Sequence, residues 1–270
     1  MTMLTPEYSA SLRDPKNALE DLRRKLGPIY GGEYLATLFH SLIRRERPRT
    51  VLELGTGLGV TTAWLASAVK ENGIGRVYTY DNGSQFEGIR NAAASLLQEV
   101  SWPATSETKD YARFLEEVWR RAGVDNEIEF RLCDIDVRAL SAGSGAIEGQ
   151  GPVDMVFADY DHSPGNVVRL LGYLLPLLSD SGSVFVDSAP THIPTHELIQ
   201  RVLAELNSGS LTSFSDLGLG EEQHSRIRRL SSTSYFSYMP MIESEHRKQN
   251  STAWIKALPR DLRASGFFLH

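Results

Sequence analysis

TVLELGTGLGVTT, residues 50–62, is the stretch of this sequence that decides its fold. Its apolar first half, interrupted only by Glu53, is typical of a buried parallel strand. Glycines at positions 55, 57 and 59 are typical of a sharp turn at which the backbone approaches a ligand closely. The residues after the turn predict a helix, whose first N–H groups suit an anionic or carboxylate-bearing ligand. The stretch therefore predicts a strand, a ligand-binding turn and a helix.

Strands and helices alternate after this stretch as far as residue 187. Strands are predicted over 76–80, 127–132, 153–158 and 183–186, with amphipathic helices between them. This alternation predicts a parallel, doubly wound α/β sheet. The last two strands are predicted over Leu211–Leu217 and Thr252–Leu258.

The composition excludes several classes of protein. The 270-residue chain is 41% hydrophobic and 23% charged, with a net charge of −6, unlike a nucleic-acid-binding protein with a basic face. The single cysteine, Cys133, excludes an internal disulfide. The longest apolar run, Leu170–Leu178, is too short to cross a bilayer. We therefore expect a cytoplasmic protein that binds neither nucleic acid nor membrane.

Carboxylates follow most of the predicted strands. In doubly wound sheets, ligands bind at the carboxyl ends of the strands, where this sequence places Gly55, Asp81, Asp134, Asp159 and Asp187. A dinucleotide fingerprint would need a sixth-position glycine in the turn, but the sequence has valine there. This departure disfavours an NAD-dependent dehydrogenase.

The sequence resembles a known family at these positions. Glu53–Gly59 together with Asp81 resembles the first two motifs of class I S-adenosylmethionine-dependent methyltransferases. Gly31–Leu35 and Asp154–His162 resemble the small-molecule O-methyltransferase branch, which includes catechol, caffeoyl-CoA and macrolide-sugar enzymes. The resemblance implies a Rossmann-like, doubly wound sheet of seven strands with helices on both faces. The sheet would be mostly parallel, with one antiparallel strand near the C-terminus.

The resemblance also implies how the chain is organised. A helical cap over residues 1–48 would precede an S-adenosylmethionine-binding core over 49–217. Residues 218–250, which lack a clean period, would form a lid or insertion or would be disordered. Residues 251–270 would supply the last strand and a tail.

The donor site can be carried over residue by residue. Glu53 and the glycine backbone would hold the methionine moiety, Asp81 would hold the ribose, and Asn82 would lie beside the adenine. The implied donor-binding residues are Glu53, Gly55, Thr56, Gly57, Gly59, Thr61, Asp81, Asn82, Cys133, Asp134, Ile135 and Asp159. Taken singly, Glu53 and Asp134 could equally be helix-capping or solvated carboxylates.

Asp159 and His162 are the candidate catalytic residues. Methyl transfer to oxygen requires the acceptor to lose a proton, and histidine is a natural general base near neutral pH. The alternative is a loop histidine that caps the next helix. The catechol-type enzymes hold magnesium with two strand-end aspartates and an amide. Asp159 and Asp187 match the aspartates, but Ser188 replaces the amide, which favours a metal-free enzyme over a magnesium enzyme.

Aromatic residues suggest an acceptor pocket. The candidates are Tyr30, Tyr34, Tyr160, Asp187, Tyr235 and Tyr238, although the tyrosines could also be core or dimer contacts. The resulting hypothesis is an enzyme of class EC 2.1.1.- that methylates a hydroxyl of a small molecule, and the family resemblance implies a homodimer. The alternatives are an N- or carboxylate-methyltransferase of the same fold and a non-catalytic protein that binds S-adenosylmethionine.

Overall fold

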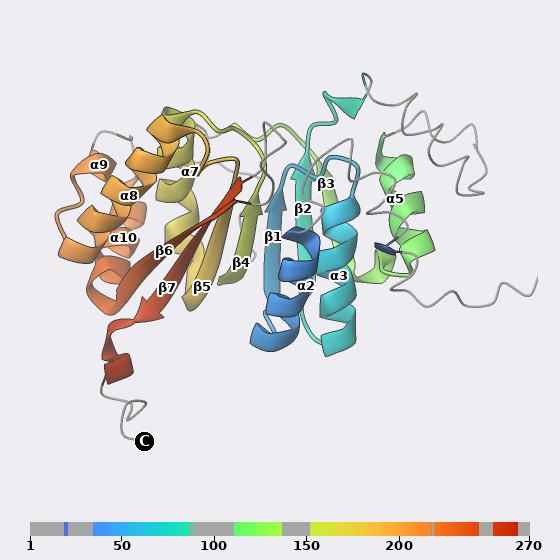
Figure 1. The fold of residues 1–270 in the computed structure, drawn as a ribbon, viewed down its shortest axis with the longest axis horizontal. Helices are drawn as coiled ribbons and strands as arrows, with labels where there is room; N and C mark the ends of the chain where they lie inside the picture. The colour runs from blue at the N-terminus through green and yellow to red at the C-terminus, as the bar shows by residue number, and fades with distance from the viewer. Residues whose placement is uncertain are drawn as a thin grey trace, which may run out of the picture.

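One sheet organises the molecule. The computed structural model describes residues 19–20, 35–86, 88, 111–136, 152–215, 217, 219–242 and 251–263. Its strands are β1 (Thr50–Leu54), β2 (Arg76–Asp81), β3 (Ile128–Leu132), β4 (Val153–Ala158), β5 (Leu178–Asp187), β6 (Ser234–Ile242) and β7 (Ser251–Pro259). Among the described residues the sheet has seven strands in the order β3-β2-β1-β4-β5-β7-β6 (Figure 1). Only β7 runs antiparallel to its neighbours within this sheet, which confirms the predicted fold.

Helices cover both faces of the sheet. They are α2 (Leu35–Glu46), α3 (Val60–Asn72), α5 (Tyr111–Ala122), α7 (Pro164–Leu174), α8 (Ile193–Ser208), α9 (Thr212–Ser215) and α10 (Glu221–Thr233), with short 3-10 helices η2 (Asp125–Glu127), η3 (Leu175–Leu177) and η4 (Arg260–Arg263). Leu52 and Leu54 point into a core shared with α7, α8 and α10, whereas Val51 points into a core shared with α2, α3 and α5. Burial on both faces explains why three of the five residues of β1 are apolar.

Helix α2 is part of this layered core. The ring of Phe39 packs edge-on against Phe157 and Phe185, at centroid distances of 4.9 and 4.8 Å. Residues 35–46 of the predicted N-terminal cap therefore cover the sheet directly. Most of the remaining cap residues lie outside the described part of the chain.

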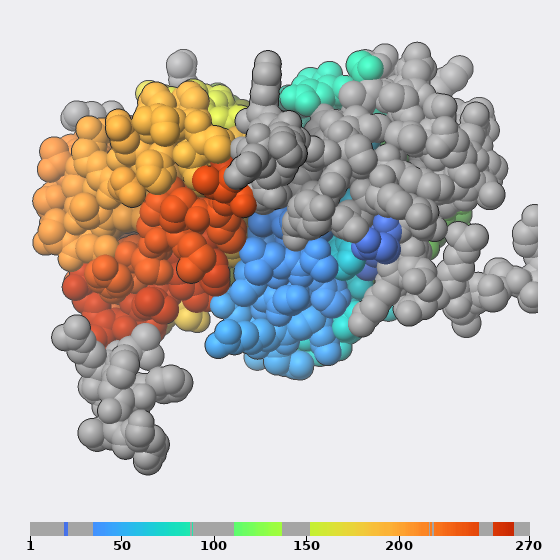
Figure 2. All heavy atoms as spheres, viewed as in Figure 1, coloured from blue at the N-terminus to red at the C-terminus, as the bar shows by residue number. Residues whose placement is uncertain are grey.

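The predicted lid over residues 218–250 is wrong for its described part. Residues 221–233 form α10, whose Ile227 and Leu230 are buried in the core. Residues 234–242 form the edge strand β6, which pairs along its whole length with β7. The surface of β6 and β7 lies open beside α2 (Figure 2), so this segment completes the sheet. Residues 243–250 lie outside the described residues.

The strand predicted over Leu211–Leu217 is also wrong. Residues 212–215 form the single turn α9, with Phe214 fully buried. The described sheet still has the expected seven strands, because β6, which was not predicted, takes the place of the strand expected over residues 211–217. No described helix has the length and apolar character needed to cross a membrane.

The order of the strands fixes where a ligand can bind. The chain passes from β1 outward to β2 and β3, then returns to β4 on the other side of β1. The strand order therefore reverses between β1 and β4. Doubly wound folds bind ligands at the carboxyl ends of the strands on either side of this switch point. The N–H of Asp159 donates to the carbonyl of Leu54 over 2.8 Å, which ties these two strand ends together.

Candidate functional site

The turn after β1 is built from glycine because its backbone has no room for side chains. Gly55 has φ of +94°, and a Cβ there would lie 2.0 Å from the backbone oxygen of Asp159. Gly59 has φ of +73°, and a Cβ there would lie 2.8 Å from the indole nitrogen of Trp119. Residues with a Cβ rarely adopt such angles. The turn thus packs tightly against both β4 and α5.

Helix α5 supports this glycine turn from behind. The hydroxyl of Tyr111 donates to the carbonyl of Gly57 over 2.7 Å, and the indole of Trp119 donates to the carbonyl of Gly59 over 3.0 Å. Gly59 is also the N-cap of α3 and provides no capping side chain. The sequence prediction missed both aromatic residues, since each lies more than 50 residues away from the glycine that it contacts.

Asp81 links the end of β2 to the same turn. Its Oδ2 accepts hydrogen bonds from the N–H groups of Thr56 and Gly57, at 2.9 and 3.1 Å, and its Oδ1 accepts one from Gly83 at 2.7 Å. The side-chain amide of the next residue, Asn82, donates to Asp134 over 3.1 Å. These bonds hold the loops after β1, β2 and β3 in one arrangement.

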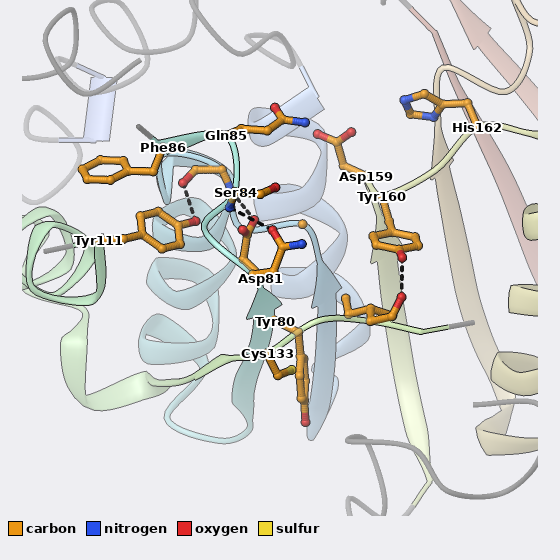
Figure 3. Close-up of a pocket in the computed structure, with 14 residues that line it drawn as sticks. Tyr80, Asp81, Ser84, Gln85, Phe86, Tyr111, Cys133, Asp159, Tyr160 and His162 are labelled. Atoms are coloured by element: carbon orange, nitrogen blue, oxygen red, sulfur yellow. Dashed lines mark hydrogen bonds between the residues drawn. The ribbon is translucent and has the colours of Figure 1, made fainter. Parts of the chain in front are cut away.

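A cavity of about 430 Å³ opens above these strand ends. It is lined by Gly55, Gly57, Tyr80, Asp81, Asn82, Ser84, Gln85, Phe86, Tyr111, Cys133, Ile135, Asp159, Tyr160 and His162. Phe86 and Tyr111 lie on one side of the cavity, and His162 lies on the other (Figure 3). Burial raises the pKa of the Cys133 thiol, so this side chain is uncharged at neutral pH. The volume fits a ligand of cofactor size.

Several predicted donor residues line this cavity and others do not. The lining includes seven of the twelve, namely Gly55, Gly57, Asp81, Asn82, Cys133, Ile135 and Asp159. Thr56, Gly59, Thr61 and Asp134 are neighbours of the cavity in sequence but do not line it. Conversely, the sequence prediction missed Ser84, Gln85 and Phe86, which follow β2 without any recognisable motif.

Glu53, which the sequence predicted to hold the methionine moiety, does not line this cavity. Glu53 is fully buried behind the turn, facing α3, and is absent from the cavity lining. Its Oε2 accepts hydrogen bonds from the hydroxyls of Thr62 and Thr79 at 2.5 and 2.6 Å. Its Oε1 has no hydrogen-bond partner among the described residues. Burial raises the pKa of this carboxyl group to about 8.

Replacing Glu53 with glutamine should remove a pH dependence of stability. Because burial raises the pKa of Glu53 from 4.5 to about 8, its contribution to stability is present below the unfolded value and is lost as the pH rises toward the folded value. Glutamine cannot ionise, yet its oxygen can still accept from Thr62 and Thr79. The free energy of unfolding of the variant should therefore gain roughly 2 kcal/mol relative to wild type between about pH 5 and about pH 7.

Urea unfolding across this pH range measures the effect. Glu197→Gln, at an exposed position of α8, is the control and should give a curve parallel to that of wild type. A parallel curve for the Glu53 variant would show that Glu53 ionises normally in the folded protein.

His162 has a defined tautomer. Its Nδ1 lies 3.1 Å from the backbone carbonyl of Asp187. A carbonyl only accepts hydrogen bonds, so Nδ1 carries a hydrogen, and in the neutral imidazole the lone pair is then on Nε2. Because His162 also lines the cavity, it is suited to accept a proton from a bound molecule.

Two carboxylates accompany this imidazole. Asp159, His162 and Asp187 offer ligand atoms that all lie within 4.8 Å of one another. Burial raises the pKa of Asp187. Ser188 has φ of +55° and donates its hydroxyl to Asp187 Oδ2 over 2.6 Å. The serine side chain is thus turned toward a carboxylate of the trio, and the three residues offer a mixed nitrogen and oxygen set to a divalent ion.

The predicted acceptor residues are only partly brought together. Tyr160 lines the cavity and its hydroxyl donates to the carbonyl of Ile135. Asp187 contacts His162, but Tyr235 and Tyr238 lie on the distant edge strand β6 and do not line the cavity. Tyr235 is half exposed, and Tyr238 pairs instead with His196 of α8 at 2.6 Å. The cavity therefore includes neither of these two tyrosines, and their role toward an acceptor stays a prediction. Tyr30 and Tyr34 lie outside the described residues.

Comparison with solved structures identifies the same fold elsewhere. An O-methyltransferase from Bacillus cereus, determined in complex with SAH, is 14% identical, with 93% of this chain and 96% of that chain covered and a TM-score of 0.50. A putative O-methyltransferase from Klebsiella pneumoniae is 14% identical, with 90% of this chain and 89% of that chain covered and a TM-score of 0.51. At such identities the likeness concerns the fold alone. No curated protein matches the chain.

The sequence itself matches a family model. The family is described as a methyltransferase domain, and its model matches residues 52–189. The match begins in β1, two residues after its start, and ends two residues after β5. It therefore contains the glycine turn, Asp81 and the trio around His162. With half of its length matched, the chain belongs to the methyltransferase-domain family.

Proposed function

We propose that this protein transfers a methyl group from S-adenosylmethionine to a hydroxyl of a small-molecule acceptor. The observation that carries the proposal is the hydrogen bond between His162 Nδ1 and the Asp187 carbonyl. It leaves a basic nitrogen at the cavity that also contains the glycine turn and Asp81. A general base beside the donor site is required for methylation of a neutral hydroxyl but has no role in a protein that only binds the donor.

The residues that line the cavity at the ends of the strands offer suitable partners for the parts of S-adenosylmethionine. Gly55 and Gly57 line the cavity and carry no side chain, so a ligand can approach their backbone closely. Asp81 has about four acceptor positions. Among the described residues, backbone N–H groups occupy three of them, which leaves one on Oδ1 for a ribose hydroxyl. Ile135 and Cys133 offer an uncharged wall for the adenine. The donor, when bound, supplies an electrophilic methyl group on a positively charged sulfur.

The residues around the acceptor would then move its proton. His162 Nε2 accepts the hydrogen of the hydroxyl, which raises the nucleophilicity of the oxygen. Asp159 and Asp187 lie close enough to stabilise the imidazolium that this transfer creates. Asp159 lies at the end of β4 between the donor side of the cavity and His162 (Figure 3).

The charges of the cavity favour a hydroxyl over a carboxylate acceptor. Among the described lining residues the acidic ones are Asp81 and Asp159, and none is lysine or arginine. An anionic acceptor would therefore lack a positive partner near His162. A carboxylate that is already ionised would also make no use of a base.

A cytoplasmic location and a homodimeric state belong to the same proposal. The family resemblance supports the homodimer, and the single cysteine is compatible with a reducing compartment. Light scattering after size-exclusion chromatography tests the oligomeric state.

Donor binding and product formation test the proposed function directly. Calorimetry with S-adenosylmethionine should detect binding. Mass spectrometry should then detect methylated products in a panel of matched small molecules that differ only in carrying a hydroxyl, an amine or a carboxylate. We expect turnover with the hydroxyl series. Donor binding without any product would favour a non-catalytic protein, and turnover confined to amines or carboxylates would favour the other methyltransferase classes.

Chelation should leave turnover unchanged. Catechol-type magnesium sites use oxygen ligands only, whereas this trio includes His162, and the serine at the third ligand position hydrogen-bonds to Asp187. We therefore expect equal rates after dialysis against EDTA and after addition of millimolar magnesium. Activity that disappears with EDTA and returns with magnesium would assign a metal to Asp159 and Asp187.

A further inference from the structure

The backbone of His162 is held by a residue on a different element. Thr195 lies in the first turn of α8 and is fully buried. Its hydroxyl donates to the backbone carbonyl of His162 over 2.6 Å. This bond spans 33 residues of sequence and ties the turn after β4 to the start of α8.

A second histidine completes the arrangement. His192 is the N-cap residue of α8, and its Nδ1 lies 2.7 Å from the Thr195 hydroxyl oxygen. Since the hydroxyl hydrogen is already donated to His162, the oxygen must accept here and His192 must donate from Nδ1. The same donor is present whether His192 is neutral or protonated, so this bond does not depend on the charge of His192.

The segment 187–195 therefore contacts both the side chain and the main chain of His162. The Asp187 carbonyl at the start of the segment accepts from the imidazole, and Thr195 at its end donates to the main chain. Ser251 fixes the middle of the segment: its carbonyl accepts from the N–H of Ser188 at 2.7 Å, and its hydroxyl lies 2.8 Å from that of Thr191.

The turn after β4, which contains His162, also has hydrogen bonds of its own. Asp161 Oδ1 accepts from the N–H of Ser163 over 2.7 Å, and Oδ2 accepts from the side-chain amide of Asn166. These bonds hold the pKa of Asp161 below its usual value although burial acts in the opposite direction. These bonds fix the shape of the turn after β4, whereas the bond from Thr195 fixes its position relative to α8.

We propose that Thr195 is a positioning residue for the general base, holding His162 so that its Nε2 is presented to the acceptor. This inference rests on the proposed function, because it assumes that His162 accepts a proton. Without the hydroxyl, the carbonyl of His162 loses its donor and the turn is free to shift away from the Asp187 carbonyl. A displacement of about 1 Å at a catalytic group can lower the rate about 100-fold, and a partial shift should lower it less.

Thr195→Val tests the inference because valine keeps the shape of threonine and lacks only the hydroxyl. We expect kcat to fall about tenfold, with the Kd of S-adenosylmethionine unchanged within about twofold. Thr195→Ser keeps a hydroxyl and should restore most of the lost kcat. The control is Thr233→Val on α10, which removes a hydroxyl bonded to the Arg229 carbonyl at 3.1 Å and should leave kcat unchanged.

Nitrogen NMR of the histidine side chains gives a second measurement that needs no activity. His162 should show the Nδ1–H tautomer in wild type and a mixture of tautomers in Thr195→Val, with thermal melting as the test of folding. An unchanged kcat and tautomer in Thr195→Val would overturn the inference, as would a serine variant as slow as the valine variant. If wild type makes no methylated product while the tautomer still responds to Thr195, the proposed function fails and the positioning contact stands.

Discussion

Replacing His162 with alanine should lower kcat for a hydroxyl acceptor by about 10²- to 10⁴-fold, the range found when a general base is lost. The physical reason is the tautomer: the Asp187 carbonyl takes the Nδ1 hydrogen and leaves Nε2 as the base at the cavity. The affinity for S-adenosylmethionine should change little, because the donor is proposed to lie against Gly55, Gly57 and Asp81, which line the same cavity as His162. Single-turnover kinetics and calorimetry measure the two quantities separately.

The pH dependence of the rate separates a base from a contact residue. If His162 is the base, the rate profiles of wild type and His162→Ala should differ in shape across pH, whereas loss of a contact alone should lower the rate by the same factor at every pH. His224→Ala, which alters a histidine on α10 outside the cavity lining, is the control and should keep the wild-type profile. Retained turnover in His162→Ala would refute the general-base role. Retained turnover with carboxylate acceptors alone would instead support a carboxylate methyltransferase.

The parts of the site that were predictable from sequence are the ends of the strands. A buried apolar run followed by glycine or aspartate is a local pattern, so Gly55, Asp81 and Asp159 could be placed at one edge of the sheet without knowing any contact. The position of His162, three residues after Asp159, follows from the same reasoning.

The residues that were missed or assigned differently depend on how the helices and strands pack against one another. Glu53 belongs to the same local motif as the glycines, but the alternation of side chains along β1 turns it toward α3 and Thr62, away from the cavity. Tyr111 and Trp119 were missed because they act through glycine carbonyls, which no sequence pattern reveals. Strand β6 was read as a lid because an edge strand that is open on one face carries Ser, Tyr, Met and Pro in place of an alternating apolar pattern.

Substitution of Gly55 by alanine should be the most damaging change to the donor site. Two costs add at this position. The φ of +94° strains any residue with a Cβ, at about 1–3 kcal/mol. The new Cβ would also lie 2.0 Å from the Asp159 carbonyl oxygen, and overpacking of this kind costs about 1–3 kcal/mol more. We expect a loss of about 3 kcal/mol in the free energy of unfolding and a Tm lower by about 6–12 °C.

Gly73→Ala separates the clash from the strain. Gly73 has φ of +67°, similarly left-handed, but an added Cβ there would meet nothing within 4 Å. The free energy of unfolding of Gly73→Ala should therefore fall only by the cost of the strained φ, and the variant should keep full affinity for S-adenosylmethionine. The Gly55 variant should bind the donor at least about tenfold more weakly, because the clash with β4 is relieved only by moving Asp159 and the glycine turn apart, and tenfold corresponds to about 1.4 kcal/mol. Equal melting temperatures and donor affinities for the two variants would show that β1 and β4 do not approach each other as closely as the structure has them.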